Sequence, residues 1–201
     1  MPDIRVYFTK TGDLKYISHL DLQRAMARLL IRSGLPIVYT EGFNPHPRLN
    51  IALPLSVYQE GEREVMDFRL SEEVPPSTVC EKLNARMFPG SSIVGAEYLS
   101  GKNAPKSAVY RLELATDVPG SKFARAFEGE MKIIKRSKSG EKEVDIAPMV
   151  KLISVTPDEG GLTARMELPA SGSDYLNPAY VAAYFGDSVK VRRIVRENIV
   201  F

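Results

Sequence analysis

Residues 41–48, EGFNPHPR, limit how this 201-residue chain can fold more than any other segment. Gly42 reaches backbone conformations that other residues avoid, and Pro45 and Pro47 each lack a backbone hydrogen-bond donor. Neither a helix nor a central strand tolerates this combination, because both need an unbroken series of donors. We therefore expect a shaped loop that presents Asn44, His46 and Arg48.

The elements around this loop follow the order β-α-β-β-α-β. Residues 4–8 alternate and are rich in β-formers, and Ser18 is a good N-cap for a helix that stops at Gly34 and Pro36. Further strands are expected within residues 49–55, 64–70 and 92–99, and a helix over residues 77–87. This is the order of a ferredoxin-like sandwich, in which two helices cover one face of a four-stranded antiparallel sheet.

The second half of the chain has a similar order. A strand is expected over residues 109–115, helices over 121–130 and 178–185, and a last strand over 189–200, with two hairpins between the helices. We thus predict an α+β protein of two tandem ferredoxin-like sandwiches. Residues 1–100 form the N-terminal domain with both histidine motifs, residues 101–107 the linker, and residues 108–201 the C-terminal domain with a basic hairpin.

Composition narrows the cellular context. The single cysteine, Cys80, excludes an internal disulfide and an all-cysteine metal cage. No apolar run reaches the roughly 18 residues of a membrane span, and the first residues lack a signal-peptide pattern. We expect a cytoplasmic protein with no membrane partner.

The segment Ser18-His19-Leu20-Asp21 has two interpretations. Ser18 and Asp21 can cap the first helix, with His19 on its first turn. Alternatively, the helix N-terminus is an anion site to which Lys10, Lys15 or Arg48 adds positive charge.

Basic residues gather locally although the net charge is only +2. Arg24, Arg28 and Arg32 form one stripe on the first helix at successive i, i+4 positions. Further concentrations lie at Lys132, Lys135, Arg136 and Lys138, and at Lys190, Arg192, Arg193 and Arg196. They are either solvated faces or a nucleic-acid surface.

The two histidines are the candidates for acid–base chemistry. Histidine exchanges a proton near neutral pH and could accept that of a ribose 2′-hydroxyl, and two prolines flank His46. His19 and His46 lie 27 positions apart without a metal-binding spacing, so we expect no metal centre and no bound cofactor. Cys80 lies beside Val79 on a helix face, where cysteines are usually inert.

The segments 16–21 and 42–48, together with Leu35-Pro36, residues 52–55 and Leu83-Asn84, resemble a bacterial family, the radical S-adenosylmethionine-linked domain of unknown function. The resemblance implies a stand-alone partner of a radical S-adenosylmethionine protein, and a gene neighbourhood that points to RNA as substrate. One cysteine cannot supply the three ligands of the radical cluster, so the chain is not that enzyme.

We therefore expect an RNA-binding or substrate-presenting accessory protein, with ribosomal or transfer RNA as candidate ligands. The alternatives are a metal-independent RNA-cleaving or RNA-modifying enzyme that uses His46 or His19, and a protein-only adaptor. Aromatic residues on the expected strands would stack on bases: Tyr7, Phe8, Phe68, Tyr98 and Tyr110.

The loop is expected to pack against the start of the first helix. This would place His46 and Asn44 near Ser18 and His19, with the ring of Phe43 buried as an anchor. The residues expected at the binding site are Lys10, Ser18, His19, Asp21, Arg24, Arg28, Arg32, Glu41, Phe43, Asn44, His46 and Arg48.

Overall fold

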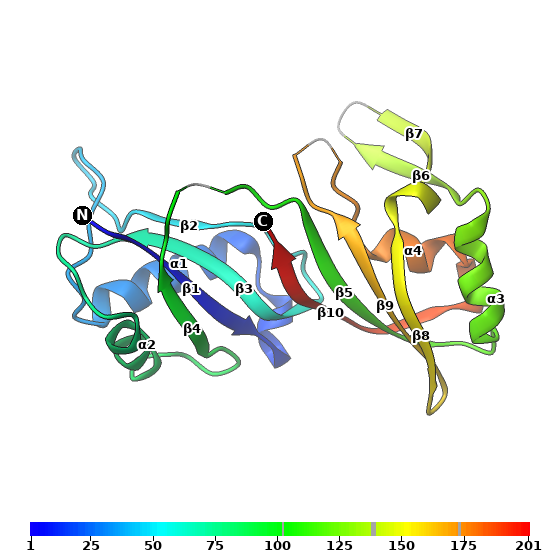
Figure 1. Ribbon diagram of the computed structural model, residues 1–201, viewed down its shortest axis with the longest axis horizontal. Helices are drawn as coiled ribbons and strands as arrows, with labels where there is room; N and C mark the ends of the chain where they lie inside the picture. Colours follow the sequence, from blue (N-terminus) through cyan, green and yellow to red (C-terminus); the bar gives the residue numbers. More distant parts are fainter. Residues whose placement is uncertain (102, 138–139, 173) are drawn as a thin grey trace. The chain divides into compact units, whose positions relative to one another are not determined.

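The computed structural model describes residues 1–101, 103–137, 140–172 and 174–201. The chain divides into two compact units, Met1–Ala104 and Pro105–Phe201. Each unit combines an antiparallel sheet with two α-helices (Figure 1), which confirms the mixed α+β class.

The sheet of the first unit has the strand order β4-β1-β3, and β2 pairs with β3 on the side away from β1. All of these pairs are antiparallel. The elements, in chain order, are β1 (Asp3–Lys10), the 3₁₀ helix η1 (Gly12–Tyr16), α1 (His19–Arg32), β2 (Leu49–Ile51), β3 (Gln59–Arg69), α2 (Pro76–Asn84) and β4 (Ile93–Tyr98).

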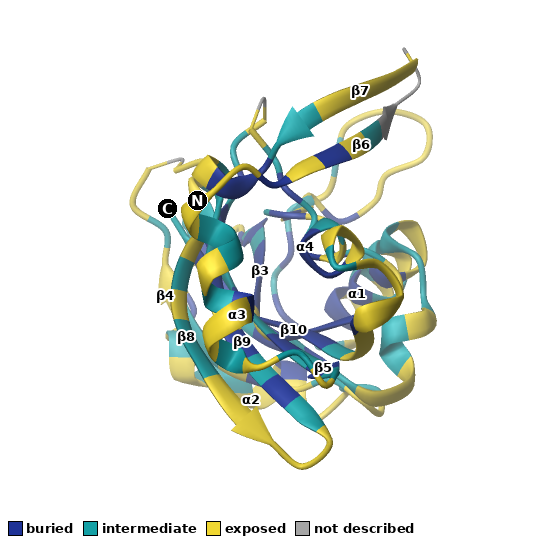
Figure 2. Cartoon of the chain, turned by 90° about the vertical axis from the view of Figure 1, so that its right-hand side faces the viewer, coloured by how far each residue is buried: buried dark blue, intermediate teal, exposed yellow. Residues whose placement is uncertain are grey.

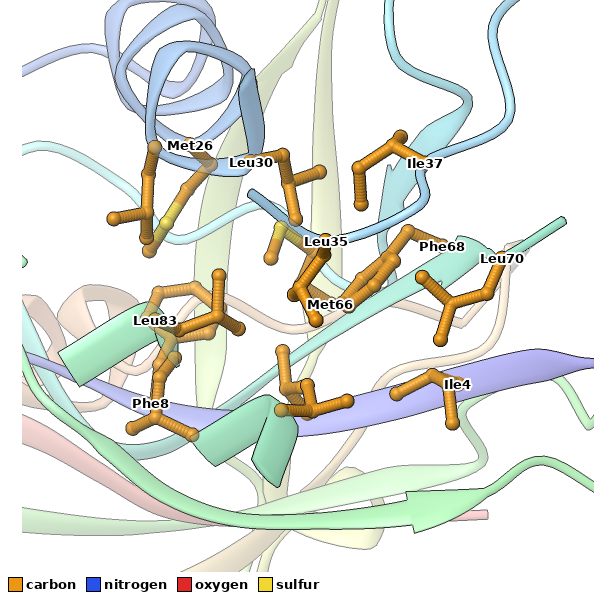
Figure 3. Packing of buried hydrophobic residues seen from close by; sticks show 14 of the residues in the cluster. Ile4, Phe8, Met26, Leu30, Leu35, Ile37, Met66, Phe68, Leu70 and Leu83 are labelled. Carbon is orange, nitrogen blue, oxygen red and sulfur yellow. The ribbon is translucent and has the colours of Figure 1, made fainter. Parts of the chain in front are cut away.

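Alternation along β1 separates the core of this unit from its opposite face. Ile4, Val6 and Phe8 are fully buried and belong to one cluster with Met66 and Phe68 of β3 (Figure 3). The cluster also takes in side chains from both helices, namely Leu22, Met26, Leu29 and Leu30 of α1 and Val79 and Leu83 of α2. Both helices therefore pack on the same face of the sheet.

The helix α1 begins and ends as its sequence predicts. Ser18 is the N-cap, and its hydroxyl oxygen accepts a hydrogen bond from the backbone N–H of Asp21. Gly34 follows the helix with a positive φ of 68°. Before this helix, Gly12 adopts φ 61° at the start of η1.

The sheet of the second unit has the order β10-β5-β9-β8, again antiparallel, and β6 and β7 form a separate hairpin. In chain order the elements are β5 (Ser107–Ala115), α3 (Gly120–Arg125), η2 (Ala126–Glu128), β6 (Lys132–Ser137), β7 (Gly140–Asp145), η3 (Ala147–Met149), β8 (Lys151–Asp158), β9 (Gly161–Pro169), α4 (Ala179–Tyr184), η4 (Gly186–Ser188) and β10 (Lys190–Val200). The rings of Phe123 and Phe185 stack at 4.6 Å, which joins α3 to the end of α4.

The helix and the hairpins expected in this unit can be compared with the structure. The helix expected over residues 121–130 is shorter: α3 ends at Arg125, and η2 continues it to Glu128, after which Gly129 adopts an extended conformation. The two hairpins expected between the helices are confirmed as β6–β7 and β8–β9, and the second turns where Asp158 lies opposite Gly161. Lys138 and Ser139 of the basic hairpin lie outside the described residues, and most of β7 is exposed (Figure 2).

The corner that leads into α1 depends on Gly90. Its carbonyl accepts hydrogen bonds from both the backbone N–H and the hydroxyl of Thr11. Gly90 has φ 84°, and a Cβ at this position would lie 2.8 Å from the carbonyl oxygen of Thr11. Gly12 has a similar φ of 61° but open space around the same position.

We expect Gly12→Ala to lower the free energy of unfolding by about 1–2 kcal/mol, the cost of a left-handed residue with a Cβ. Gly90→Ala should cost more, because it adds a collision with backbone that cannot rotate away. Urea unfolding of both variants measures the difference. Equal losses would contradict the idea that the approach of Gly90 to Thr11 matters.

Candidate functional site

A hollow of about 1000 Å³ lies in the first unit, between α1, the 40–50 segment and one end of the sheet. Its lining combines charged, amide and apolar side chains. The residues are Asp3, Leu20, Gln23, Arg24, Ala27, Thr40, Asn44, His46, Pro47, Arg48, Leu49, Asn50, Asp67, Phe68, Arg69, Leu99, Asn103 and Ala104.

One wall of the hollow is the glycine- and proline-rich loop. Its two arms are held together by hydrogen bonds from the N–H of Thr40 to the carbonyl of His46 and from the N–H of Arg48 to the carbonyl of Val38. Pro47 is buried, whereas residues 41–46 and Arg48 are exposed. The prolines thus turn the chain so that its polar residues face solvent and the hollow.

His46 is held in one orientation by this loop. Its Nδ1 lies 3.2 Å from the carbonyl oxygen of Asn44 and 3.2 Å from the hydroxyl of Thr40, whose oxygen also accepts from the backbone N–H of His46. A carbonyl can only accept a hydrogen bond, so the contact with Asn44 favours the tautomer that carries the ring proton on Nδ1. Nε2 is then left with a lone pair that can accept a proton.

The first turns of α1 also line the hollow. Leu20, Gln23 and Arg24 line the hollow there, and the guanidinium of Arg24 lies 3.1 Å from the carboxylate of Asp21 in a solvent-exposed pair. Arg28 and Arg32 continue the stripe along exposed positions of α1 but do not line the hollow.

Two ion pairs between β1 and β3 stand on the face of the sheet away from the helices. Asp3 receives a bidentate contact from Arg69 at 2.7 and 2.8 Å, and Arg5 donates a bidentate contact to Asp67 at 2.8 and 2.9 Å. The hydrogen bond to Asp67 raises the pKa of Arg5, against the lowering effect of burial. Asp3, Asp67 and Arg69 belong to the hollow, so these lining charges are already neutralised.

The unbalanced charge of the hollow is positive. Among the residues that the structure describes, the side chain of Arg48 has no hydrogen-bond or ion-pair partner. Within the described parts of the chain, Arg24 pairs only with the exposed Asp21. The site therefore favours an anionic ligand.

The hollow brings together four of the residues expected at the binding site. These are Arg24, Asn44, His46 and Arg48. The others are outside its lining: Lys10, Ser18, His19, Asp21, Arg28, Arg32, Glu41 and Phe43. The loop and the start of α1 thus line one hollow through His46 and Arg24, with His19 apart from it.

The anion site at the helix N-terminus loses one of its expected cations. Lys10 is 1% exposed, and its ammonium group donates to the backbone carbonyl of Gln59 at 3.3 Å. The expected role of Lys10 at that site is therefore wrong. The carboxylate of Asp21 occupies the helix start, where it accepts from the hydroxyl of Ser18 at 2.7 Å.

Phe43 is exposed, whereas the sequence predicts it to be a buried anchor. Its side chain is fully exposed at the tip of the loop, after Gly42 with φ 116°. Three of the aromatic residues expected to stack on bases are buried instead: Phe8, Phe68 and Tyr110. Phe8 and Phe68 alternate onto the helix-covered face of the sheet, whereas Tyr7 points to the other face, where Arg63 lies 3.9 Å over its ring.

The remaining expectations concern His19, Cys80 and metal binding. Nδ1 of His19 is buried without a hydrogen-bond partner among the described residues. Burial raises the pKa of the Cys80 thiol, which makes it a poor nucleophile. In the described parts of the chain, no three His, Cys, Asp or Glu side chains are grouped to hold a metal ion.

Sequence reasoning missed the charged pairs of β1 and β3, the amide of Asn50 and the apolar side chain of Leu20. The alternating charges Asp3/Arg5 and Asp67/Arg69 were a usable signal. Reading it required the register in which Asp3 faces Arg69.

We expect Ser18→Ala to lower the free energy of unfolding by about 1 kcal/mol at neutral pH, because the helix loses its cap. The hydrogen bond from Ser18, and then Arg24, lowers the pKa of Asp21. The variant should raise that pKa toward its ordinary value, which NMR titration measures.

The pH dependence has a definite sign. A carboxyl group whose pKa is lowered by folding contributes its full stabilisation above its unfolded pKa, and loses it as the pH falls through the folded value. The difference between parent and Ser18→Ala should therefore shrink in acid. Ser33→Ala, at the other end of α1, is the control, and an Asp21 pKa unchanged in Ser18→Ala would contradict this assignment.

No helix in the described residues is long and apolar enough to cross a membrane. No curated protein matches the chain. Among solved structures, a chain from the "Crystal Structure of a Cbf5-Nop10-Gar1 Complex" matches with a TM-score of 0.50 at 16% identity, over 98% of this chain and 48% of that one. This chain thus spans about half the length of that one, and the likeness concerns the fold alone. The family model described as an uncharacterized protein conserved in bacteria (DUF2344) matches residues 3–178, and the chain therefore belongs to that family.

Proposed function

We propose that this protein is a cytoplasmic RNA-binding module that presents RNA to a separate catalytic protein. The observation that carries the proposal is the pair of arginines that line one hollow, Arg48 on the loop and Arg24 on α1. A guanidinium binds phosphate through two parallel donors, so two such groups in one hollow suit a sugar-phosphate strand.

The rest of the lining suits the other parts of a nucleotide. Asn44 and Asn50 offer amide donors and acceptors of the kind that read base edges, and Leu20 and Leu49 offer apolar surface for a flat ring. The exposed ring of Phe43 lies at the tip of the same loop and is available for stacking on an unpaired base. Single-stranded RNA offers a phosphate for the arginines, base edges for the amides, and flat unpaired bases for the apolar and aromatic side chains.

The architecture supports this proposal at the level of the scaffold. In each unit, the four strands of the main sheet follow the spatial order last, first, third, second, with antiparallel neighbours. We interpret both units as ferredoxin-like sandwiches, the second with the β6–β7 hairpin as an insertion. The catalytic partner in the proposal is a radical S-adenosylmethionine enzyme, on the strength of the sequence resemblance described above.

The test removes one arginine from the hollow and one from elsewhere. Arg48→Ala should weaken binding of single-stranded RNA and reduce the slope of log affinity against log salt by about 0.7, the value for one phosphate contact on a single strand. Arg86→Ala removes the same charge from an exposed position outside the hollow and is the matched control. Fluorescence anisotropy over a salt series measures both.

Two results would contradict the RNA proposal. One is an affinity of the parent protein no stronger than that of an unrelated acidic protein. The other is an equal loss in Arg48→Ala and Arg86→Ala, which would indicate only general charge. Binding of a protein partner without RNA would instead favour the adaptor alternative.

The orientation of His46 favours a second candidate, metal-independent RNA cleavage. With its proton on Nδ1, His46 can accept the proton of a ribose 2′-hydroxyl at Nε2. The 2′-oxygen then forms a bond to the adjacent phosphorus, the bond from phosphorus to the 5′-oxygen breaks, and the 5′-oxygen takes a proton from solvent water, while the proton on Nε2 is later released to solvent. The products are a 2′,3′-cyclic phosphate and a 5′-hydroxyl.

For this candidate, we expect cleavage in the presence of a metal chelator, with cyclic phosphate ends detected by mass spectrometry. His46→Ala should abolish the product while retaining RNA binding, and His19→Ala should retain activity because His19 lies outside the hollow. Absence of cyclic phosphate from the parent, or its persistence in His46→Ala, would remove this candidate and leave RNA binding as the function.

A further inference from the structure

A second group of exposed aromatic side chains lies in the first unit, outside the residues that line the hollow. Tyr16 ends η1 and is 55% exposed, and Tyr58 precedes β3 and is 72% exposed. Their ring centroids lie 5.8 Å apart with an interplanar angle of 81°, and the ammonium of Lys15 lies 5.2 Å from the centroid of the Tyr16 ring. We call Lys15, Tyr16 and Tyr58 the tyrosine patch.

The backbone of Tyr58 adopts an energetically unfavourable conformation. Tyr58 has φ 69°, and it is the only residue other than glycine with a positive φ among those described. A bulky side chain rarely adopts this conformation, and a glycine or asparagine would adopt it with less strain. Hydrogen bonds from the N–H of Tyr58 to Lys15 and from the N–H of Gln59 to Ser56 fix the turn.

The rings contribute little to the stability of the unit. Neither belongs to the buried cluster, and neither hydroxyl has a hydrogen-bond partner in the parts of the chain that the structure describes. Tyr58 therefore combines a strained backbone conformation with an exposed ring. Strained residues persist where the surrounding structure holds them in place, and they cluster at ligand-binding sites, so this combination points to a ligand.

We propose that the tyrosine patch is a stacking platform for an unpaired base of the RNA strand, in addition to the contacts in the hollow. This inference rests on the proposed RNA binding. Tyr58 is 72% exposed and its ring is the surface offered to a flat base, and every base can stack irrespective of sequence. The ammonium of Lys15 lies over the ring of Tyr16 and supplies a positive charge for the phosphate of the same nucleotide.

A nucleic-acid occupant fits this patch better than an apolar protein surface does. The patch is made of two hydroxyl-bearing rings and a cation, not of aliphatic side chains, and Arg24, Arg28 and Arg32 follow on the next helix. A polyanion with flat bases matches this combination of charge and rings.

The test compares strands that differ only in their bases. Fluorescent oligoadenylate and an abasic sugar-phosphate strand of the same length are titrated into the full chain. The parent should bind oligoadenylate more tightly than the abasic strand. Tyr58→Asn, which tolerates the positive φ, should weaken oligoadenylate binding at least about fivefold and abolish most of this preference.

Two controls separate stacking from loss of structure. Tyr58→Phe keeps the ring and should retain the affinity of the parent. Tyr184→Leu removes a partly exposed tyrosine of α4, to which no role in binding is assigned, and should also bind as the parent does. Ultraviolet cross-linking to oligoadenylate should yield adducts on Tyr16 or Tyr58.

The outcomes distinguish this inference from the proposed function. If Arg48→Ala weakens binding but Tyr58→Asn leaves the preference for bases intact, RNA binding stands and the stacking platform is wrong. If the parent binds neither strand, both are wrong. An equal loss for oligoadenylate and the abasic strand in Tyr58→Asn would also overturn the platform, because stacking requires a base.

Discussion

The register between β1 and β3 determines both the core and the candidate site of the first unit. Ile4 stands opposite Phe68 and Val6 opposite Met66, so one face of the pair is apolar and accepts both helices. In the same register Asp3 meets Arg69 and Arg5 meets Asp67 on the other face. A slip of one residue would bury four charges and expose the core, so the pairing is strongly specified.

The loop at residues 41–48 adds the cationic wall, and its sequence explains why that wall is exposed. A residue in a strand interior contributes its N–H to the sheet, whereas Pro45 and Pro47 have none to contribute. The chain leaves the sheet, and two backbone hydrogen bonds between residues 38–40 and 46–48 close the loop. His46 and Arg48 are therefore held by the backbone with their side chains outward, which lowers the entropy cost of binding a ligand.

Local signals in the sequence predicted much of this arrangement. The N-cap at Ser18, the end of α1 at Gly34 and the loop character of residues 41–48 all depend on backbone chemistry that a few neighbouring residues decide. The predictions that failed concern the burial of single side chains, which depends on tertiary packing. Lys10 is buried at the end of β1, and Phe43 is exposed rather than an anchor. Four of the candidate residues, Arg24, Asn44, His46 and Arg48, do line one hollow. The ion pairs beside it could not be predicted from the sequence, because they depend on the register between β1 and β3.

A net charge of only +2 is compatible with binding a polyanion, because a bound phosphate senses nearby charges. At physiological salt the Debye length is about 8 Å, so distant surface charges are largely screened. Within the hollow, Asp3 is matched by Arg69 and Asp67 by Arg5. These bidentate pairs hold their carboxylates close to cations, so they repel a phosphate less than isolated carboxylates would. The electrostatic potential in the hollow therefore depends more on Arg48 than on the net charge of the whole chain. Because the proline-containing loop fixes the backbone of Arg48, this positive charge stays at the hollow.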